Sequence, residues 1–223
     1  MRHILFLGVA LALLLSGRPL WAENPDDSLL IYAVNIHRTP TQSWPGSGIY
    51  LGKGLFITAA HVVGNAWLTR PKVVIGEKEY PTRVVKEGSL EGTDLTLLSV
   101  EEDQLPIRLR LRRNPLCVEH PWAGEEVITV VPGSTARSRI IPPEKLPLNV
   151  RNFNTVIGDV ARTGNSGSGV FDAQRRCLLG IISRKISLSG KRADTGKTET
   201  RDIAKYFVPA STISAFIPAE LRF

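Results

Sequence analysis

Thr163-Gly-Asn-Ser-Gly-Ser-Gly169 is the stretch of the chain that says most about its fold and chemistry. It places Ser166 among glycines, whose backbone can turn tightly and approach a bound group closely. Amides in such a turn can point at the place where negative charge develops on a carbonyl oxygen. The stretch therefore predicts a nucleophilic serine, Ser166, with an oxyanion hole formed by Gly164, Asn165 and Ser166. Ser168 is the rival nucleophile in the same stretch.

A serine hydroxyl needs a base, and the chain offers one upstream. Residues 55–63 read as a buried strand that ends in a small-residue turn and presents His61. Asp94 stands at the start of another apolar strand, 95–100. Imidazole can take the proton of serine, and a carboxylate can fix the tautomer of the imidazole. Each residue also has a structural interpretation without catalysis. Ser166 could be a turn serine, His61 a histidine with its hydrogen bonds satisfied at a strand end, and Asp94 a helix or turn cap. All three alternatives must hold together to remove the predicted triad.

The motifs occur in the order histidine, aspartate, serine, and in this the chain resembles the chymotrypsin-fold serine proteases. It resembles most the bacterial HtrA-type and glutamyl-endopeptidase branches. The matching stretches are 46–63, 93–95 and 164–167, with weaker ones at 179–183 and 206–213. The resemblance implies an all-β fold of two six-stranded antiparallel barrels with a short C-terminal helix. It departs from typical HtrA proteins because no stretch is left for a PDZ domain.

The spacing of apolar segments is typical of such barrels. Short strands separated by glycine, proline and asparagine recur every eight to twelve residues. We expect lobe one at about 28–101, a polar linker at about 102–115, and lobe two at about 116–223. The predicted strands are 29–36, 48–51, 55–58, 73–75, 82–85 and 95–100, then 126–131, 137–141, 154–157, 169–172, 177–183 and 205–209. Helical spacing of apolar residues predicts a helix within 211–221.

The N-terminus has the pattern of a signal peptide. Arg2 and His3 precede an apolar run at 4–15, and Ala22 offers a small residue for cleavage. The run is short for a membrane span, although an uncleaved anchor is the alternative. We therefore expect residues 1–22 to be removed and 23–223 to form an exported bacterial protein, periplasmic or secreted. No later stretch is apolar enough to cross a bilayer.

The cysteine content bears on disulfide and metal binding. Cys117 and Cys177 are the two cysteines. In an oxidising compartment they can form a disulfide, or both can be buried thiols. No cysteine–histidine cluster has zinc spacing, so we expect neither a metal nor another cofactor.

The formal net charge is +7. The basic residues gather at 108–113 and 184–201 without interleaved aromatics, which argues against nucleic-acid binding. We interpret them as a solvated linker and an exposed loop. An anionic membrane surface or an acidic substrate is the alternative.

Substrate preference rests on the resemblance alone. It implies a pocket whose base lies near Asp159 and Val160 and whose wall is formed by Ile182, Ser183, Arg184 and Lys185. Asp159 favours basic substrate residues, whereas Arg184 and Lys185 favour acidic ones, and both options stay open.

Asn165 also departs from the digestive proteases of this fold, which have an aspartate before the nucleophile. That aspartate pairs with a newly cut N-terminus, and neutral Asn165 cannot. We infer that activation does not use a new N-terminus.

These patterns predict an exported serine endopeptidase that acts on peptides or unfolded proteins through an acyl-enzyme. The alternative is a catalytically inactive module of the same fold that binds peptides or a partner. Fold alone does not separate the two.

Overall fold

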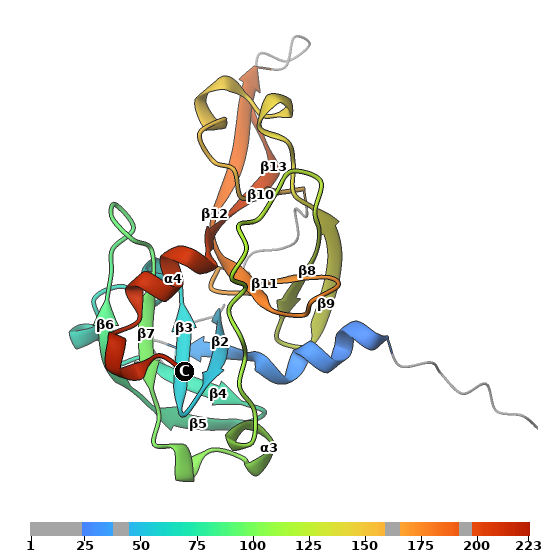
Figure 1. The fold of residues 1–223 in the computed structure, drawn as a ribbon. Coiled ribbons are helices and arrows are strands. Elements are labelled where there is room, and N and C mark those ends of the chain that lie inside the picture. The colour runs from blue at the N-terminus through green and yellow to red at the C-terminus, as the bar shows by residue number, and fades with distance from the viewer. Residues whose placement is uncertain (1–23, 38–44, 159–165, 192–197) are drawn as a thin grey trace, which may run out of the picture.

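Two curled antiparallel β-sheets make up the body of the molecule, and the linker and the C-terminal segment cross between them (Figure 1). The computed structural model describes residues 24–37, 45–158, 166–191 and 198–223. The first sheet has the order β5-β4-β1-β2-β3-β7-β6. Its strands are β1 (Ala33–His37), β2 (Gly46–Gly52), β3 (Leu55–Thr58), β4 (Lys72–Ile75), β5 (Lys78–Pro81), β6 (Arg83–Glu87) and β7 (Thr96–Ser99).

The second sheet has the order β10-β13-β12-β11-β8-β9. Its strands are β8 (Glu126–Val131), β9 (Ser134–Arg139), β10 (Val156–Ile157), β11 (Gly169–Asp172), β12 (Leu178–Lys191) and β13 (Thr198–Pro209). The all-β, chymotrypsin-like fold class predicted from the sequence is confirmed.

The first sheet differs from the prediction in two places. It has seven strands rather than six, because β5 forms a strand that was not predicted. Tyr80 is the one buried residue of β5. The segment predicted as the start of a strand is instead the 3-10 helix η1 (Pro25–Tyr32). The carbonyl oxygen of the Asn24 side chain accepts a 3.1 Å hydrogen bond from the Asp26 amide and caps this helix. The strand proper begins only at Ala33.

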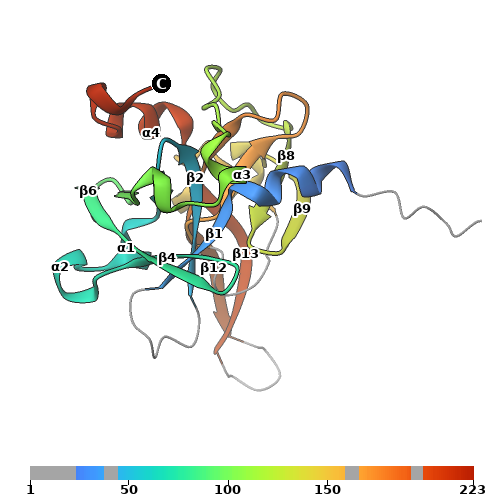
Figure 2. The same cartoon turned by 90° about the horizontal axis from the view of Figure 1, so that it is seen from below.

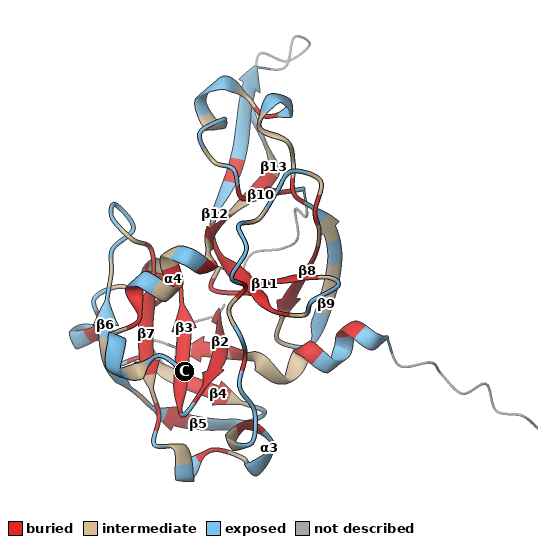
Figure 3. Ribbon diagram, in the orientation of Figure 1, coloured by how far each residue is buried: buried red, intermediate tan, exposed pale blue. Residues whose placement is uncertain are grey.

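The core continues from one sheet into the other. One buried cluster joins Ile49, Ile57 and Leu97 of the first sheet to Ile128 and Phe171 of the second. Figure 3 shows this buried zone where the strands of both sheets face each other. Burial of large apolar side chains is the main force that holds such layers together. The two sheets are therefore parts of one packed body.

Short helices complete the chain. They are α1 (Ala60–Val63), α2 (Ala66–Thr69), η2 (Glu102–Gln104), α3 (Ile107–Arg110), η3 (Pro143–Lys145), η4 (Leu148–Val150), α4 (Ala210–Phe216) and η5 (Ala219–Leu221). The predicted C-terminal helix is α4, which buries Ile213 and Phe216. Seen from below, η1 lies beside β8 and β9 (Figure 2). Within the described ranges, no helix has the length and apolar character needed to span a membrane.

A disulfide joins Cys117 to Cys177. Cys117 follows the linker, and Cys177 directly precedes β12. The Cys117 amide also donates a 3.0 Å hydrogen bond to the carbonyl of Leu178. The sequence allowed either a disulfide or two buried thiols, and the structure has the disulfide. This bond fixes the end of the linker to the second sheet.

Candidate active site

His61 and Asp94 meet at one end of the first sheet. His61 lies in α1, the helix that follows β3, and Asp94 lies in the loop just before β7. These two strands are neighbours, with Thr58 opposite Thr96. Nδ1 of His61 is 2.9 Å from Oδ2 and 3.1 Å from Oδ1 of Asp94. The backbone amide of His61 also donates to Oδ1 at 3.0 Å. The carboxylate therefore fixes both the ring and the backbone of the histidine.

The environment of Asp94 keeps it ionised. Its side chain is only 3% exposed, and this burial alone would raise the pKa of the carboxyl group. Hydrogen bonds from the His61 ring, the Ser183 hydroxyl and the His61 amide outweigh burial and hold the pKa of Asp94 below its ordinary value. With Asp94 as acceptor, Nδ1 of His61 carries the proton. The other ring nitrogen, Nε2, is then left free to accept one.

Ser183 is a site residue whose role the sequence analysis missed. It was predicted as part of a pocket wall, but its side chain is buried, and Oγ donates a 2.5 Å hydrogen bond to Oδ2 of Asp94. Ser183 lies on β12 of the second sheet, whereas Asp94 belongs to the first. The one signal in the sequence was its place at the end of the apolar run 179–182.

The backbone of Ser166 is held between the two sheets. Its carbonyl accepts a 2.9 Å hydrogen bond from the amide of Ser47 on β2. The carbonyl of Ser47 in turn accepts a 2.6 Å bond from Oγ1 of Thr58, three residues before His61. The next amide, that of Gly167, donates to the carbonyl of Ile182 at 2.8 Å. Ser166 is thereby fixed to the segments that carry His61 and Ser183.

Gly167 shows why this turn needs glycine. Its φ is +85°, in the region that residues with a side chain rarely adopt. A Cβ at this position would lie 1.9 Å from the carbonyl oxygen of Ser47 and 2.4 Å from Oγ1 of Thr58. The close contact between the Ser166 turn and β2 therefore depends on the absence of a side chain.

The two candidate serines differ in exposure. The side chain of Ser168 is fully buried, and within the described part of the chain its hydroxyl has no hydrogen-bond partner. Its carbonyl accepts a 2.9 Å bond from the amide of Ile182, so it continues the sheet. Ser166 is partly exposed. Ser166 is therefore in contact with solvent, whereas Ser168 is enclosed.

The predicted pocket is described only in part. Gly164 and Asn165 of the oxyanion hole, and Asp159 and Val160 of the pocket base, lie outside the described residues. Of the predicted wall, Ile182 packs into the core of the second sheet, beside buried Ser183.

The two basic residues of the predicted wall are exposed and make polar contacts. Arg184 donates to the carbonyl of Leu90 in the first lobe, across the boundary between the sheets. Lys185 pairs with Asp202 at 2.8 Å. Arg184 and Lys185, the two cations predicted to favour acidic substrates, therefore already have polar partners within the protein.

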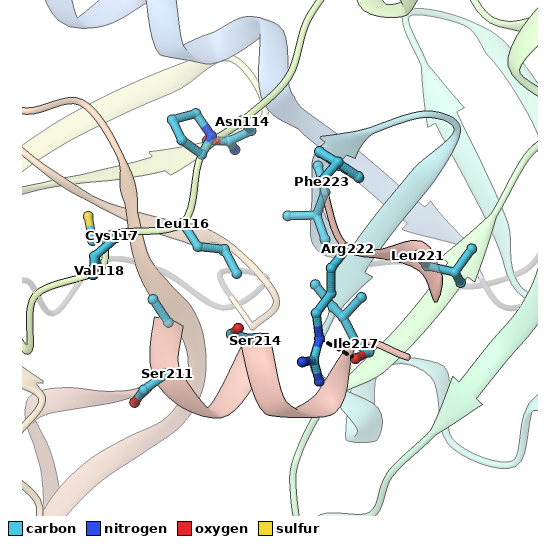
Figure 4. A pocket seen from close by; sticks show the side chains of 13 residues that line it. Asn114, Leu116, Cys117, Val118, Ser211, Ser214, Ile217, Leu221, Arg222 and Phe223 are labelled. Atoms are coloured by element: carbon cyan, nitrogen blue, oxygen red, sulfur yellow. Dashed lines mark hydrogen bonds between the residues drawn. The ribbon is translucent and has the colours of Figure 1, made fainter. Parts of the chain in front are cut away.

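A cavity of about 490 Å³ lies elsewhere, between the linker and α4 (Figure 4). Leu116, Ser214 and Phe223 are among the residues that line it, whereas His61, Asp94 and Ser166 are not. In the part of the chain that the structure describes, no group of three or more His, Cys, Asp or Glu side chains is arranged to hold a metal ion.

The chain was compared with models of known protein families and with known proteins. The model of the trypsin-like peptidase domain matches residues 46–181. No curated protein sequence matches the chain.

Solved structures share the fold at low sequence identity. An inactive form of Rv3671c from M. tuberculosis is 17% identical, with 89% of this chain and 91% of that chain covered and a TM-score of 0.58. The serine endoprotease from Yersinia pestis is 18% identical, with 84% and 64% covered and a TM-score of 0.58. The HtrA-type protease AlgW with a tripeptide is 17% identical, with 86% and 62% covered and a TM-score of 0.57. Identities this low establish the fold alone.

Proposed function

Because the chain belongs to the trypsin-like peptidase family, we propose that it is a serine endopeptidase working through His61, Asp94 and Ser166. The observation that carries the proposal is the His61–Asp94 pair, joined through Nδ1 at 2.9 Å. The pair leaves Nε2 of His61 free for the serine proton. The Ser166 backbone is tied to the segments that flank this pair.

The proposed reaction has two stages. Oγ of Ser166 attacks the scissile carbonyl while Nε2 of His61 takes its proton. The protonated imidazole, stabilised by the Asp94 carboxylate, then gives that proton to the leaving amine, and an acyl-enzyme remains. Water attacks the ester by the same route in reverse, and Ser166 is released. Amides of the 164–166 turn are the proposed donors to the oxyanion.

The substrate in this proposal is a peptide or an unfolded protein. The same sequence pattern that led us to expect a signal peptide at 1–22 supports export to the periplasm or the medium. No cofactor takes part in the proposed reaction, since serine, histidine and aspartate together supply nucleophile, base and charge.

Burst kinetics test the acyl-enzyme directly. With p-nitrophenyl acetate, the wild-type protein should release about one equivalent of nitrophenolate per site in a fast phase, followed by slow turnover. Ser166→Ala should abolish the fast phase, and Ser168→Ala should keep it. Cleavage of a fully unfolded protein, with the new N-termini identified by mass spectrometry, shows the endopeptidase step. A folded wild-type protein with neither burst nor cleavage favours the binding module.

A further inference from the structure

The cavity between the linker and α4 has no part in the proposed reaction (Figure 4). Its volume is about 490 Å³, whereas roughly 10–15 Å³ is enough for a cavity to hold one water molecule. Protein interiors are close-packed, and few of their voids exceed the size of a water molecule. Binding sites for small molecules have volumes of about 300–1,000 Å³. The cavity therefore has the size of a ligand site and not that of a packing defect.

The walls of this cavity are mainly aliphatic. Leu51 of β2, Leu116 of the linker and Ile217 after α4 line it. Val118 and Phe223 also line it, and they are 97% and 53% exposed. Large exposed apolar side chains around a hollow are typical of a surface that binds an apolar group. Such a group gains free energy on leaving water for these walls.

Two polar side chains, Ser214 and Arg222, interrupt the apolar walls. Ser214 projects from α4 toward the cavity, and its hydroxyl can donate a hydrogen bond (Figure 4). Nε of Arg222 donates to the carbonyl of Ile217 at 3.1 Å, which holds the guanidinium beside the cavity. Within the described residues Arg222 forms no ion pair, and none of the residues that line the cavity is acidic. The polar part of this cavity therefore favours an anion.

Further positive charge lies at the Phe223 end of the cavity. Nζ of Lys53 is 5.0 Å from the centre of the Phe223 ring, and Cζ of Arg113 is 5.9 Å from it. Arg113 pairs with Glu102 at 3.4 Å, whereas Lys53 forms no ion pair with any described residue. Lys53 and Arg222 thus leave positive charge without a partner near the cavity, and such charge attracts anions.

We propose that this cavity binds a medium-chain fatty acid as its carboxylate. The alkyl chain lies between Leu116 and Ile217, and the carboxylate accepts hydrogen bonds from Arg222 and Ser214. An alkyl chain has no polar atom to satisfy and can bend to follow an irregular aliphatic wall. A hydrogen bond from guanidinium to carboxylate is about twice as strong as a neutral one. The site is separate from the candidate active site, so the inference holds whether or not the protein is a peptidase.

An anionic membrane surface is the competing occupant of this face. Arg108, Arg112 and Leu111 of the linker are exposed, and such residues could lie against a bilayer. However, Leu51 and Ile217 are only 2% and 6% exposed, so they lie too deep to contact a flat surface. A single chain that enters the hollow reaches them. The depth of the walls therefore favours one fatty acid over a bilayer.

Calorimetric titration with saturated carboxylates of six to twelve carbons, each below its critical micelle concentration, tests the site. Affinity should increase about three- to fourfold with each added CH₂ group until the cavity is filled. Decanol has the same chain as decanoate without the charge, and it should bind about tenfold more weakly. Absence of saturable decanoate binding to the folded wild type, or equal affinity for decanoate and decanol, overturns the proposal.

Two pairs of variants locate the site. Ser214→Phe places a ring in the cavity and should abolish decanoate binding, whereas Ala215→Phe adds the same ring at the next, exposed position of α4 and should not. Arg222→Gln should weaken decanoate binding about tenfold and leave decanol binding unchanged. Arg112→Gln removes an exposed linker arginine and should change neither.

Thermal unfolding checks that each of these variants is folded. Arg222 is exposed, so Arg222→Gln stays informative even where Ser214→Phe does not fold. A decanoate affinity that is the same in the wild type and in folded Arg222→Gln overturns the proposal. A photoreactive diazirine analogue of decanoate should label peptides from 114–118 or 210–223, and labelling confined to other peptides also overturns it.

Two further measurements separate the other occupants. Binding to phosphatidylglycerol vesicles that survives Ser214→Phe, without decanoate binding by the wild type, would make this face a membrane surface and overturn the proposal. Sedimentation of the wild type shows whether a second copy covers the face. A dimer that Ser214→Phe dissociates and that decanoate leaves intact would assign the cavity to that copy instead. A wild type that binds decanoate as a monomer supports the proposal.

Discussion

Oγ of Ser183 donates to Oδ2 of Asp94 at 2.5 Å, and the same oxygen accepts from Nδ1 of His61 at 2.9 Å. Ser183 comes from the second sheet, whereas Asp94 and His61 come from the first. The hydrogen bond therefore joins the sheets at the carboxylate that orients the proposed base. It also helps to keep the pKa of Asp94 low in spite of burial.

Ser183→Ala should lower kcat/KM by about tenfold, because a hydrogen bond to a charged group is worth about 1.5–3 kcal/mol and only part of it is lost in the transition state. The pKa of Asp94 should also rise in this variant, since the carboxylate loses a hydrogen-bond donor. Ser187→Ala is the matched control, because it removes an exposed serine–aspartate hydrogen bond between β12 and β13. Equal kcat/KM for Ser183→Ala and Ser187→Ala on a short peptide would contradict the role of Ser183.

Asp94→Asn should lower kcat by about 10⁴-fold, because an amide does not stabilise the imidazolium and favours the wrong tautomer of His61. Thermal unfolding of the same variant checks that the loss is chemical and not structural. A decrease in kcat of less than tenfold, in a folded variant, would remove Asp94 from the mechanism.

Gly167→Ala should destabilise the fold and stop the reaction at Ser166. The added Cβ would overlap the carbonyl of Ser47, and φ at +85° adds a cost of about 1–2 kcal/mol for any residue with a side chain. Gly76 is a matched control, since its φ is +64° and nothing lies within 4 Å of an added Cβ. Urea unfolding should show a loss of about 1–2 kcal/mol for Gly76→Ala and a clearly larger one for Gly167→Ala. Similar losses for the two variants would show that the contact with Ser47 is not tight.

The environment of Asp26 predicts that the free energy of unfolding depends on pH. It is 2% exposed, and Nε of Arg137 donates to it at 2.7 Å. This hydrogen bond, helped by Arg176 and opposed by burial, lowers the pKa of Asp26 from its ordinary value of 3.8. For a depressed pKa, the stabilisation is complete above the unfolded pKa and is lost as pH falls through the folded one. The charged form of Asp26 therefore stabilises the fold at neutral pH and ceases to do so in acid.

Asp26→Asn should lower the free energy of unfolding by about 2 kcal/mol at neutral pH, since the arginines remain partly solvated. The difference from wild type should shrink below the ordinary pKa of the carboxyl group. Urea unfolding at neutral and acid pH measures it. Glu79→Gln breaks an exposed pair with Lys72 and should change nothing measurable. A gap between wild type and Asp26→Asn that stays constant with pH would contradict the assignment.

Removing the disulfide should destabilise the protein without abolishing the site. Cys117 and Cys177 are 60 residues apart, and closing a loop of this length in the unfolded chain is worth about 4 kcal/mol in the chain-entropy treatment. The double variant Cys117→Ser, Cys177→Ser should unfold at lower urea than the oxidised wild type. Reductant should destabilise the wild type to a similar extent and leave the double variant unchanged. Sensitivity of the double variant to reductant would point to another cause.

Much of this arrangement could be predicted from the sequence. His61 and Asp94 lie beside strongly apolar strands, so local pattern singled them out, and the chain order of the resembling family linked them. That β3 and β7 are neighbours and bring the two side chains together comes from the structure. β5 was missed because only Tyr80 in it is buried, which leaves no alternating pattern. The partners of Asp26 and Asp94 were also beyond the sequence, since Arg137 and Ser183 are 111 and 89 residues away. Contacts between residues so far apart in the sequence depend on how the two sheets pack. A single sequence has no local pattern that predicts them.

Mass spectrometry of the protein after reaction with a fluorophosphonate tests the central claim most directly. We expect one adduct per chain, mapped to Ser166, formed by the wild type and by Ser168→Ala, absent in Ser166→Ala and strongly slowed in His61→Ala. An adduct on Ser168, or none on a folded wild-type protein at any pH, would contradict the assignment of Ser166 as a nucleophile activated by His61.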